Sequence, residues 1–491
     1  MPRLRERDET YFTTVRGMCR ECRRIVPARV FFRGGQVWQQ SLCPTCKGEP
    51  ALIAGDQPWY LANVLRAMPD RAPLAGARPS RLGCPHDCGP CAWHASPCQL
   101  PVLSITNACN LRCPICFTYN RAEPVYHMPA EELQGILDWI TESSGPVDLV
   151  NLTGGEPTLH PNLIELLKLC KRPGIGRVTM NSNGLRLAED AGLCRQLAEL
   201  DVYVILSLNT LDPKMSLRLH GRDLVEVKLR AIENLTRAGA KITLLNVMIR
   251  GENEDAAAGL LDLLRSSENI LSLTIQTMTY TGQGGGKFPR GRHIPADEAA
   301  RIVSAQSGGR IRFDDFTTRP SAHPLCYLIC YLLTSGGELH PLARLAPRDQ
   351  VEKLLEDSYL IRPGRDERFF RQLIDQLYAQ GRDAELAVLR DLVERLYPPG
   401  TPWDDFRRQQ IAESAVRTVY VHAHMDEDTF DCSRAMLCPD LVPAEPGRLV
   451  PACTYNLFYR VQDSRFYEEE AGLHDSRSSS RCAVSRGVGF P

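Results

Sequence analysis

The chain has 491 residues, and its 58 Lys and Arg residues nearly balance its 59 Asp and Glu residues, which gives a formal net charge of −1. Hydrophobic residues make up 43% and charged residues 24%, a composition that is ordinary for a folded protein and excludes a collagen-like, coiled-coil or wholly disordered chain. The length corresponds to about two to four domains. The balanced charge argues against a dedicated nucleic-acid binder, so we expect no nucleic-acid partner.

The sequence shows none of the signals that direct a chain into or across a membrane. No apolar run approaches the roughly 18 residues of a membrane span. The first ten residues, MPRLRERDET, are charged and lack the apolar centre of a signal peptide. We therefore expect a cytoplasmic location and no transmembrane segment, and peripheral contact with a membrane stays open.

Cysteine is the unusual residue, with 19 copies. An odd count and tight spacings argue against a disulfide framework. Most of the cysteines fall before residue 120 or between residues 326 and 453, and this clustering is typical of metal sites. Cys170 and Cys194 lie in helical patterns and are predicted core residues.

Residues 1–60 are predicted to form a small rubredoxin-like or zinc-knuckle unit. Its CxxC pairs are Cys19 with Cys22 and Cys43 with Cys46. Between them, two β-prone runs flank a Gly-Gly pair, which indicates a hairpin. Four thiolates in two knuckles predict one tetrahedral ion, either Fe or Zn, because both metals accept this ligand set.

Residues 61–100 begin with a linker over 61–80 that is rich in Ala, Pro and Arg. A second cysteine group follows within fifteen residues: Cys84, Cys88, Cys91 and Cys98. We expect these thiolates to hold an auxiliary [4Fe–4S] cluster, with a zinc site as the alternative.

Residues 101–320 alternate strands with helices. The expected strands are 102–106, 202–209 and 241–251, and a strand followed by a turn or Gly-rich loop is expected in each of 148–155, 177–184 and 271–286. Helices are expected over 162–171 and 224–239. This βα repetition predicts parallel strands in an α/β fold, either a barrel or an open sheet.

Residues 321–469 are expected to form an α+β domain, mostly helical over 342–418 and with strands over 419–462. It holds five cysteines, Cys326, Cys330, Cys432, Cys438 and Cys453, of which we favour Cys326, Cys438 and Cys453 as ligands of another cluster, with Cys330 or Cys432 as the fourth. The alternative is that HPLCYLICYLL is a buried helix whose cysteines are small apolar residues. His424 and Asp426 either serve the site or cap a turn. The tail over 470–491, with Cys482, is predicted to be disordered.

The chemistry is concentrated in the loop after the first barrel strand. There Cys109, Cys113 and Cys116 have CxxxCxxC spacing, so three thiolates can hold three irons of a [4Fe–4S] cluster and leave the fourth iron open. Cys84, Cys88 and Cys91 share this spacing, so the context of a preceding strand distinguishes the two triplets. The second feature of that context is TGGEPTLHP at 153–161, one βα unit later.

Together these motifs closely resemble the signature of the radical S-adenosylmethionine (SAM) superfamily. The resemblance implies a partial (β/α) barrel in which the open iron binds SAM and reductive cleavage yields a 5′-deoxyadenosyl radical that removes hydrogen from an unreactive carbon. It also implies SAM contacts from residues at the strand ends: Gly154, Gly155, Glu156, Pro157, Asn181, Ser182, Asn183, Gly184, Ser207 and Asn209. Glu156 would accept a hydrogen bond from the SAM ammonium.

A narrower resemblance covers about residues 17–462. The ordered segments CRECRRIVPARV, CPTC, GCPHDCGPCAWH, TNACNLRCPICF, TGGEPTLHP, HPLCY and PACTYN are similar to the family that includes the archaeal tetraether lipid synthase and a 7,8-dihydro-6-hydroxymethylpterin methyltransferase. The resemblance implies a rubredoxin-like site, the SAM cluster, auxiliary clusters and an electron donor such as flavodoxin or ferredoxin. Ser321 stands where many relatives are expected to carry a cysteine.

Three functions fit these motifs. The first is functionalisation of an unactivated C–H bond on a lipid chain, including C–C bond formation. The second is radical methylation of a pterin-like heterocycle, and the third is a non-catalytic, Cys-rich metal-binding protein. Peptide modification also stays open, whereas cobalamin-dependent methylation is disfavoured because no Rossmann-like domain precedes the barrel. An apolar pocket open to the surface would favour a lipid, and a closed polar pocket with a carboxylate would favour a pterin.

Overall fold

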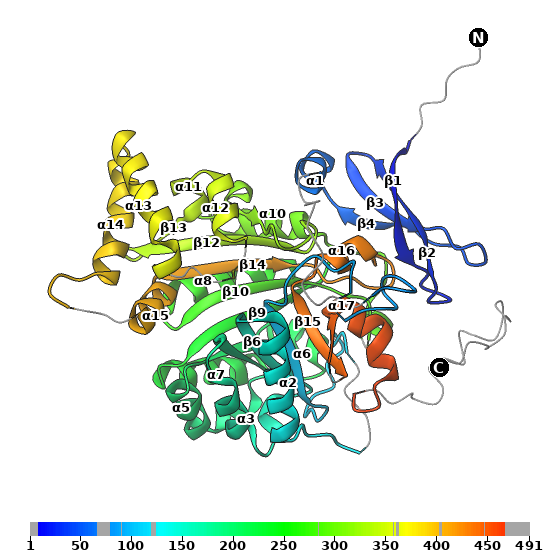
Figure 1. Cartoon of the computed structure of the whole chain (residues 1–491), viewed down its shortest axis with the longest axis horizontal. Helices are drawn as coiled ribbons and strands as arrows, with labels where there is room; N and C mark the ends of the chain where they lie inside the picture. Colours follow the sequence, from blue (N-terminus) through cyan, green and yellow to red (C-terminus); the bar gives the residue numbers. More distant parts are fainter. Residues whose placement is uncertain are drawn as a thin grey trace, which may run out of the picture.

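The computed structural model describes residues 8–65, 79–89, 91–118, 124–282, 284–356, 358–359, 363–401, 405–445 and 447–466. Most of the linker predicted over 61–80 lies outside the described residues, as does the tail over 470–491 with Cys482. Two sheets organise the described chain, one with four strands and one with twelve (Figure 1).

The small sheet is formed by the N-terminal residues. It is an antiparallel arrangement of β1 (Thr10–Met18), β2 (Ile25–Arg33), β3 (Gln36–Ser41) and β4 (Ala51–Ala54), followed by α1 (Gln57–Val64). The expected hairpin is present as β2 and β3, and Gly34 and Gly35 turn the chain with φ of 57° and 75°. A tight two-residue hairpin turn requires this left-handed region, which glycine adopts without strain.

The large sheet contains the predicted parallel strands. They are β5 (Leu100–Thr106), β6 (Val147–Gly154), β7 (Ile175–Ser182), β8 (Val202–Ser207), β9 (Lys241–Met248) and β10 (Ile270–Thr277). The full order is β11-β12-β14-β10-β9-β8-β7-β6-β5-β15-β16, with β13 beside β12. In the described residues the two end strands, β11 and β16, pair with different neighbours and not with each other. The sheet is therefore an open, partial barrel.

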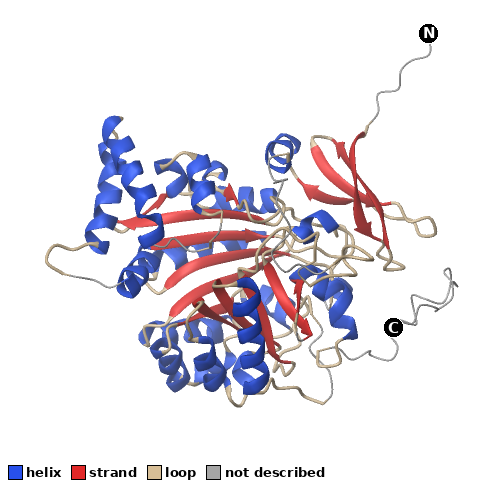
Figure 2. Cartoon of the chain, viewed as in Figure 1, coloured by secondary structure: helices blue, strands red, loops and turns tan. Residues whose placement is uncertain are grey.

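Helices between the strands cover the outer face of the sheet, as Figure 2 shows. Their bounds are α2 (Ala130–Ser144), α3 (Leu163–Cys170), α4 (Leu185–Glu189), α5 (Ala191–Glu199), α6 (Pro213–His220), α7 (Val225–Arg237), α8 (Ala257–Ser266), α9 (Gly284–Lys287) and α10 (Ala296–Gln306). Successive helices contact successive strands: α3 lies on β7, α5 on β8, α7 on β9 and α8 on β10.

The strands alternate between this helix-covered face and the interior. In β9, Ile242, Leu244 and Met248 are buried in the main core, whereas Thr243 and Leu245 face a cavity inside the barrel. Parallel strands buried on both faces are normally apolar throughout. Polar residues on the inner face of this sheet therefore indicate a binding site.

The C-terminal part of the chain adds a helical layer and further strands. These elements are β11 (Thr317–Thr318), β12 (Tyr327–Ser335), β13 (Glu338–Pro341), α11 (Leu342–Leu345), α12 (Arg348–Leu354), α13 (Pro363–Ala379), α14 (Asp383–Leu396), α15 (Asp405–Ala415), β14 (Val416–His422), α16 (Cys432–Met436), β15 (Asp440–Glu445), β16 (Arg448–Pro451) and α17 (Ala452–Thr454). The helical alternative for HPLCYLICYLL is wrong, because Tyr327–Ser335 pairs antiparallel with β14 as a strand. Its apolar residues are buried between two cores rather than on one helix face.

The C-terminal strands do not form a sheet of their own. β14 pairs parallel with β10 at one side of the barrel, and β15 pairs parallel with β5 at the other. One continuous sheet thus contains strands from both sides of the predicted boundary at residue 320, and the domain limits stay predictions. In the described residues, none of the helices combines the length and apolar character needed to cross a membrane.

Candidate active site

The cysteine triplet lies where the parallel strands end. Cys109, Cys113 and Cys116 follow β5, and all three line one large cavity. Within the described residues, their sulfurs do not form a group as tight as the 4.8 Å spacing found where a single ion could bind. The wider arrangement fits a cluster of several irons, because each thiolate then binds a different iron.

The Gly-Gly turn after β6 packs directly on the cysteine loop. A Cβ atom on Gly154 would lie 2.2 Å from the Thr106 carbonyl oxygen, and one on Gly155 would lie 2.1 Å from the Ala108 carbonyl oxygen. Hydrogen bonds join the two loops, since Gly155 N donates to Thr106 O (2.8 Å) and Glu156 N donates to Ala108 O (2.7 Å). Glycine is therefore required here so that the backbone beside Cys109 can lie against the second loop.

Glu156 connects this turn to the next one along the sheet. Its Oε1 accepts hydrogen bonds from Thr158 N, Thr158 Oγ1 and Ser182 Oγ, and its Oε2 accepts one from Asn183 N at 2.7 Å. Burial raises the pKa of Glu156, and the bonds from Asn183 and Thr158 oppose that rise. A carboxylate offers about four acceptor positions, and these four hydrogen bonds match that number. The contact between Glu156 and SAM stays a prediction. The structure shows in addition that Glu156 fixes its own turn to the turn that holds Ser182 and Asn183.

The other predicted SAM residues divide into two groups. Asn181, Asn183 and Ser207 line the cavity, and the buried Asn181 Oδ1 has no hydrogen-bond partner in the described residues. Asn209 instead makes hydrogen bonds to other protein residues. Its Nδ2 lies 2.9 Å from His220 Nε2, and its Oδ1 accepts a hydrogen bond from Val247 N at 2.6 Å. These bonds fix the segment after β8 to its neighbours, and the contact of Asn209 with SAM stays a prediction.

A buried lysine beside the triplet was missed by the sequence analysis. Lys228 Nζ donates to the carbonyl and hydroxyl oxygens of Ser207 at 2.5 and 3.1 Å, and the residue is only 1% exposed. Burial lowers its pKa to about 8, while the nearby Cys113 and Glu156 oppose that change. The available signal was its position on the apolar face of α7, three residues after Val225 and three before Ala231.

The cavity that contains these groups has a volume of about 940 Å³. Ligand pockets commonly measure about 300–1,000 Å³, so SAM and a second small molecule could both fit. Hydroxyl and amide side chains cover much of the wall: Ser104, Asn151, Thr153, Thr179, Asn181, Thr243, Ser272, Thr274, Gln276 and Thr418. Another part of the wall is apolar and includes Leu100, Val102, Leu149, Ile205 and Leu245, and apolar atoms contribute more of the lining surface than polar atoms do.

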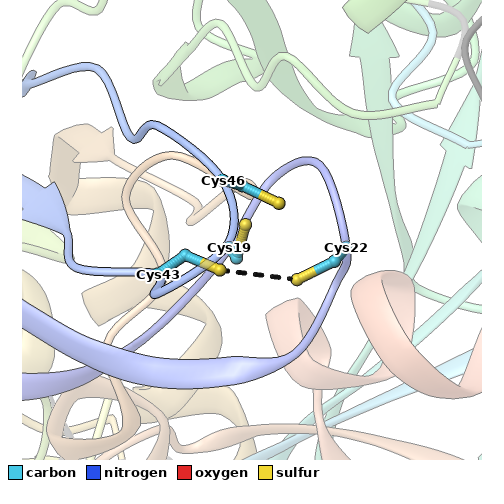
Figure 3. A group of neighbouring side chains, drawn as sticks. All are labelled: Cys19, Cys22, Cys43 and Cys46. Atoms are coloured by element: carbon cyan, nitrogen blue, oxygen red, sulfur yellow. Dashed lines mark hydrogen bonds between the residues drawn. The ribbon is translucent and has the colours of Figure 1, made fainter. Parts of the chain in front are cut away.

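The N-terminal cysteines converge as the two CxxC pairs predict. Cys19, Cys22, Cys43 and Cys46 point toward one another in Figure 3, and their sulfurs all lie within 4.8 Å of one another. The Sγ atoms of Cys22 and Cys43 are 3.8 Å apart. This donor set fits one tetrahedral ion, and both Fe and Zn remain compatible with it.

In the second cysteine group, the fourth cysteine near Cys84, Cys88 and Cys91 is Cys432, whereas Cys98 was expected. Cys84, Cys88 and Cys91 are buried and line one small cavity. Cys432 adjoins Cys84, because its Sγ lies 3.4 Å from Cys84 O and Cys84 Sγ lies 3.9 Å from Cys432 O. Cys98 instead packs in the main hydrophobic core.

The third group gathers around Arg434. Arg434 Nε donates to Cys326 Sγ at 3.4 Å, and Cys438 and Cys453 interact electrostatically with Cys326. Cys330 lies apart, fully buried in the main core near Asp315 and Arg344. The structure therefore brings Cys326, Cys438 and Cys453 together. Of the two suggested fourth ligands, Cys330 lies in the main core, and Cys432 shares an apolar cluster with Cys453 but adjoins Cys84.

His424 and Asp426 have separate positions. His424 lines the cavity, with Nδ1 at 3.4 Å from Cys453 Sγ, and burial lowers its pKa well below the usual value. Asp426 Oδ1 caps the following turn by accepting from Asp428 N and Thr429 N, and Oδ2 lies 2.8 Å from His293 Nε2.

Comparison with known proteins agrees with this geometry. Residues 103–264 match the family model described as the Radical SAM superfamily. The chain is 24% identical to the 7,8-dihydro-6-hydroxymethylpterin dimethyltransferase of Methanocaldococcus jannaschii, over 91% of this chain and 93% of that protein. It is 31% identical to the GTP 3′,8-cyclase of Chlorobaculum tepidum, over 36% of this chain and about half (52%) of the cyclase.

Among solved structures, Streptococcus suis SuiB bound to precursor peptide SuiA is similar to this chain, with 21% identity and a TM-score of 0.36 over 43% of this chain and 46% of that one. The matched segment 103–264 contains the cysteine triplet, the Gly-Gly turn and the strand ends that surround the cavity. A domain of this kind implies a [4Fe–4S] cluster and SAM. Residues 103–264 are therefore a radical SAM domain.

Proposed function

We propose that this protein is a radical SAM methyltransferase that acts on a small, polar, pterin-like heterocycle. The observation that carries the proposal is the cavity, because the cysteine triplet shares it with a wall rich in hydroxyl and amide groups. The similarity to a pterin dimethyltransferase over most of both chains supports it. When bound, the cluster and SAM would supply a radical that removes hydrogen from the substrate.

The chain's own residues would bind and orient the two molecules. Gly154 and Gly155 hold the second loop against the cysteine loop, and Asn183 and Ser207 border the space beside it. Ser272 Oγ is buried at the opposite wall and, like Asn181 Oδ1, is unpartnered in the described part of the chain. Unsatisfied buried groups of this kind favour a ligand that can hydrogen-bond to them.

We propose cluster ligands on the same basis. Cys109, Cys113 and Cys116 would hold the SAM cluster, and Cys84, Cys88, Cys91 and Cys432 would hold an auxiliary cluster. Cys326, Cys438 and Cys453 would supply three ligands of another. One apolar cluster links these regions, since it contains Met18 beside Cys19 together with Cys84, Cys432 and Cys453. Electrons from a donor such as flavodoxin or ferredoxin would pass inward along this route if the N-terminal ion is iron.

The lipid alternative rests on the apolar part of the cavity wall, where Leu100, Val102 and Leu149 lie. An assay can compare the two substrate classes directly. The anaerobically reconstituted protein is incubated with SAM, a reductant and either 7,8-dihydro-6-hydroxymethylpterin or an isoprenoid ether lipid, and products are identified by mass spectrometry.

Methylated pterin together with 5′-deoxyadenosine would support the proposal. Modified lipid with unchanged pterin would replace it with the lipid function. The matched control lacks Cys109, Cys113 and Cys116, each changed to Ala, and should give neither product. Full 5′-deoxyadenosine formation by this control would contradict the assignment of the SAM cluster.

A further inference from the structure

One end of the cavity contains a buried carboxylate that the cysteine motifs do not explain. Asp440 begins β15, is 3% exposed and lines the cavity. Tyr359 Oη donates to its Oδ1 at 2.7 Å, and Tyr327 Oη donates to its Oδ2. Two tyrosines from distant parts of the chain thus hold the carboxylate in a fixed orientation.

The carboxylate keeps acceptor capacity for a ligand. An ionised carboxylate has about four acceptor positions, and the two tyrosine hydroxyls occupy one on each oxygen. His422 Nε2 is 3.9 Å from Oδ2, which is beyond hydrogen-bond distance. As far as the described residues go, one acceptor position on each oxygen is therefore available to a molecule with two neighbouring N–H donors.

An aromatic wall runs from Asp440 toward the cysteine triplet. The Tyr327 ring stacks on His422 at 4.2 Å between centroids, and His422 lies 4.0 Å from His424. His424 in turn stacks on Phe117 at 5.6 Å, and Phe117 directly follows Cys116. Tyr327, His422, His424 and Phe117 all line the cavity, so aromatic rings border it along this path.

We propose that Asp440 accepts two hydrogen bonds from the N–H groups along one edge of a planar nitrogen heterocycle. This heterocycle binds along the aromatic wall with its far end toward the cysteine triplet. The proposal rests on the proposed function and specifies its substrate class: a ring with an amino group next to a ring N–H, as in a 2-amino-4-oxopyrimidine. Two parallel N–H···O bonds to one carboxylate give both affinity and orientation. Stacking accepts a flat ring of either one or two fused cycles.

The test compares two probes on the reconstituted holoprotein. 6-Hydroxymethylpterin carries the 2-amino donor, and 6-hydroxymethyllumazine carries an oxygen there. Equilibrium dialysis should show tighter binding of the pterin by the unchanged protein. Asp440→Asn should weaken pterin binding by about 10- to 100-fold, because an amide offers one donor and one acceptor in place of two acceptors. Its lumazine affinity should change much less.

Two further variants keep the test decisive. Tyr359→Phe retains the carboxylate and removes one hydrogen bond to it, so pterin binding should weaken by about 2- to 10-fold. Asp315→Asn is the matched control, because Asp315 is also a buried aspartate but accepts a hydrogen bond from Arg344 Nε at 2.8 Å and does not line the cavity. It should leave the difference between the two probes unchanged. Iron content and circular dichroism establish that each variant is folded.

The outcomes separate this inference from the proposed function. If the unchanged protein methylates the pterin while Asp440→Asn and Tyr359→Phe keep full pterin affinity, Asp440 does not read the substrate and the proposed function stands. If the unchanged protein neither binds nor methylates the pterin, the proposed function fails and the inference fails with it. Equal losses for both probes in Asp440→Asn would assign Asp440 a structural role and overturn the inference.

Discussion

At the residue scale, the site depends on how closely two loops approach each other. Gly155 has no room for a side chain, because a Cβ atom there would lie 2.1 Å from the carbonyl oxygen of Ala108, one residue before Cys109. That neighbour is backbone and cannot rotate away. The Gly-Gly turn therefore sets the position of the cysteine loop as well as any ligand contact.

We predict that Gly155→Ala displaces this loop and prevents assembly of the SAM cluster, with a loss of about four irons per chain. Iron analysis and the visible absorption of the reconstituted protein measure this. Gly135→Ala in α2 is the control, since a Cβ there would meet nothing within 4 Å. The control should keep its iron and gain about 0.5–1 kcal/mol of helix stability. Full iron content in Gly155→Ala would show that the loop can shift at no cost.

Lys228 gives a second prediction at this scale. A buried positive charge beside Cys113 favours the more negative, reduced state of a cluster bound there. Lys228→Met should therefore lower the reduction potential of the SAM cluster by on the order of 60 mV, the one-electron equivalent of a tenfold change. Potentiometric titration followed by electron paramagnetic resonance measures the shift. Lys214→Met, at an exposed position in α6, should leave the potential unchanged.

At the scale of elements, α15 closes the end of the barrel opposite to the cysteine loop. Glu413 on this helix pairs with Arg177 of β7 at 3.0 Å and with Lys241 of β9 at 3.5 Å, and it accepts a hydrogen bond from Tyr203 of β8. Its side chain is only 9% exposed. One carboxylate thus joins α15 to three neighbouring strands.

Glu413→Ala should destabilise the fold by about 3–5 kcal/mol, because it leaves two buried cations without this carboxylate. Glu233→Ala is the matched control: its partner Arg237 is on the same helix, and both side chains are about two-thirds exposed. That variant should change stability by less than about 1 kcal/mol. Denaturant unfolding of the two variants tests the prediction, and equal midpoints would contradict a closing role for α15.

The strands of the barrel were predictable because each carries its own signal in the sequence. Apolar runs separated by amphipathic helices indicate parallel strands, and the structure contains β5 to β10 close to the expected positions. The pairing of β14 with β10 and of β15 with β5 was not predictable in the same way. These contacts join residues far apart in the chain, and a strand's local pattern does not identify its neighbour.

The site shows the same division between local and distant information. The cysteine triplet and the Gly-Gly turn were identified from spacing and context, and the structure places them on adjacent loops. Cys432 was one of two candidates for the fourth ligand beside Cys326, Cys438 and Cys453, and the fold sets it next to Cys84. Asp440 had no sequence signal, because its tyrosine partners come from two other segments.

At the scale of the whole molecule, the cysteine groups predict the metal content. Three [4Fe–4S] clusters and one N-terminal ion give about twelve to thirteen irons per chain, depending on whether that ion is iron or zinc. Cys432→Ala should remove about four of them, whereas Cys98→Ala should remove none. Metal analysis of both variants after reconstitution measures this. The reverse result would restore Cys98 as the fourth ligand, and a total of about four irons in the unchanged protein would remove both auxiliary clusters.

The C-terminal strands β14 and β15, which flank the six parallel strands, also have a consequence for synthesis of the chain. The parallel strands β5 to β10 are complete once residue 277 has been made, but the strands that cover their edges, β14 and β15, come only after residue 415. Exposed strand edges template pairing with other chains. During translation, the nascent barrel therefore carries two uncovered edges while about 140 further residues emerge, which at roughly 5–20 residues per second takes on the order of ten seconds. Chaperone binding to the half-made chain should be strongest in this interval and should end when β15 reaches β5.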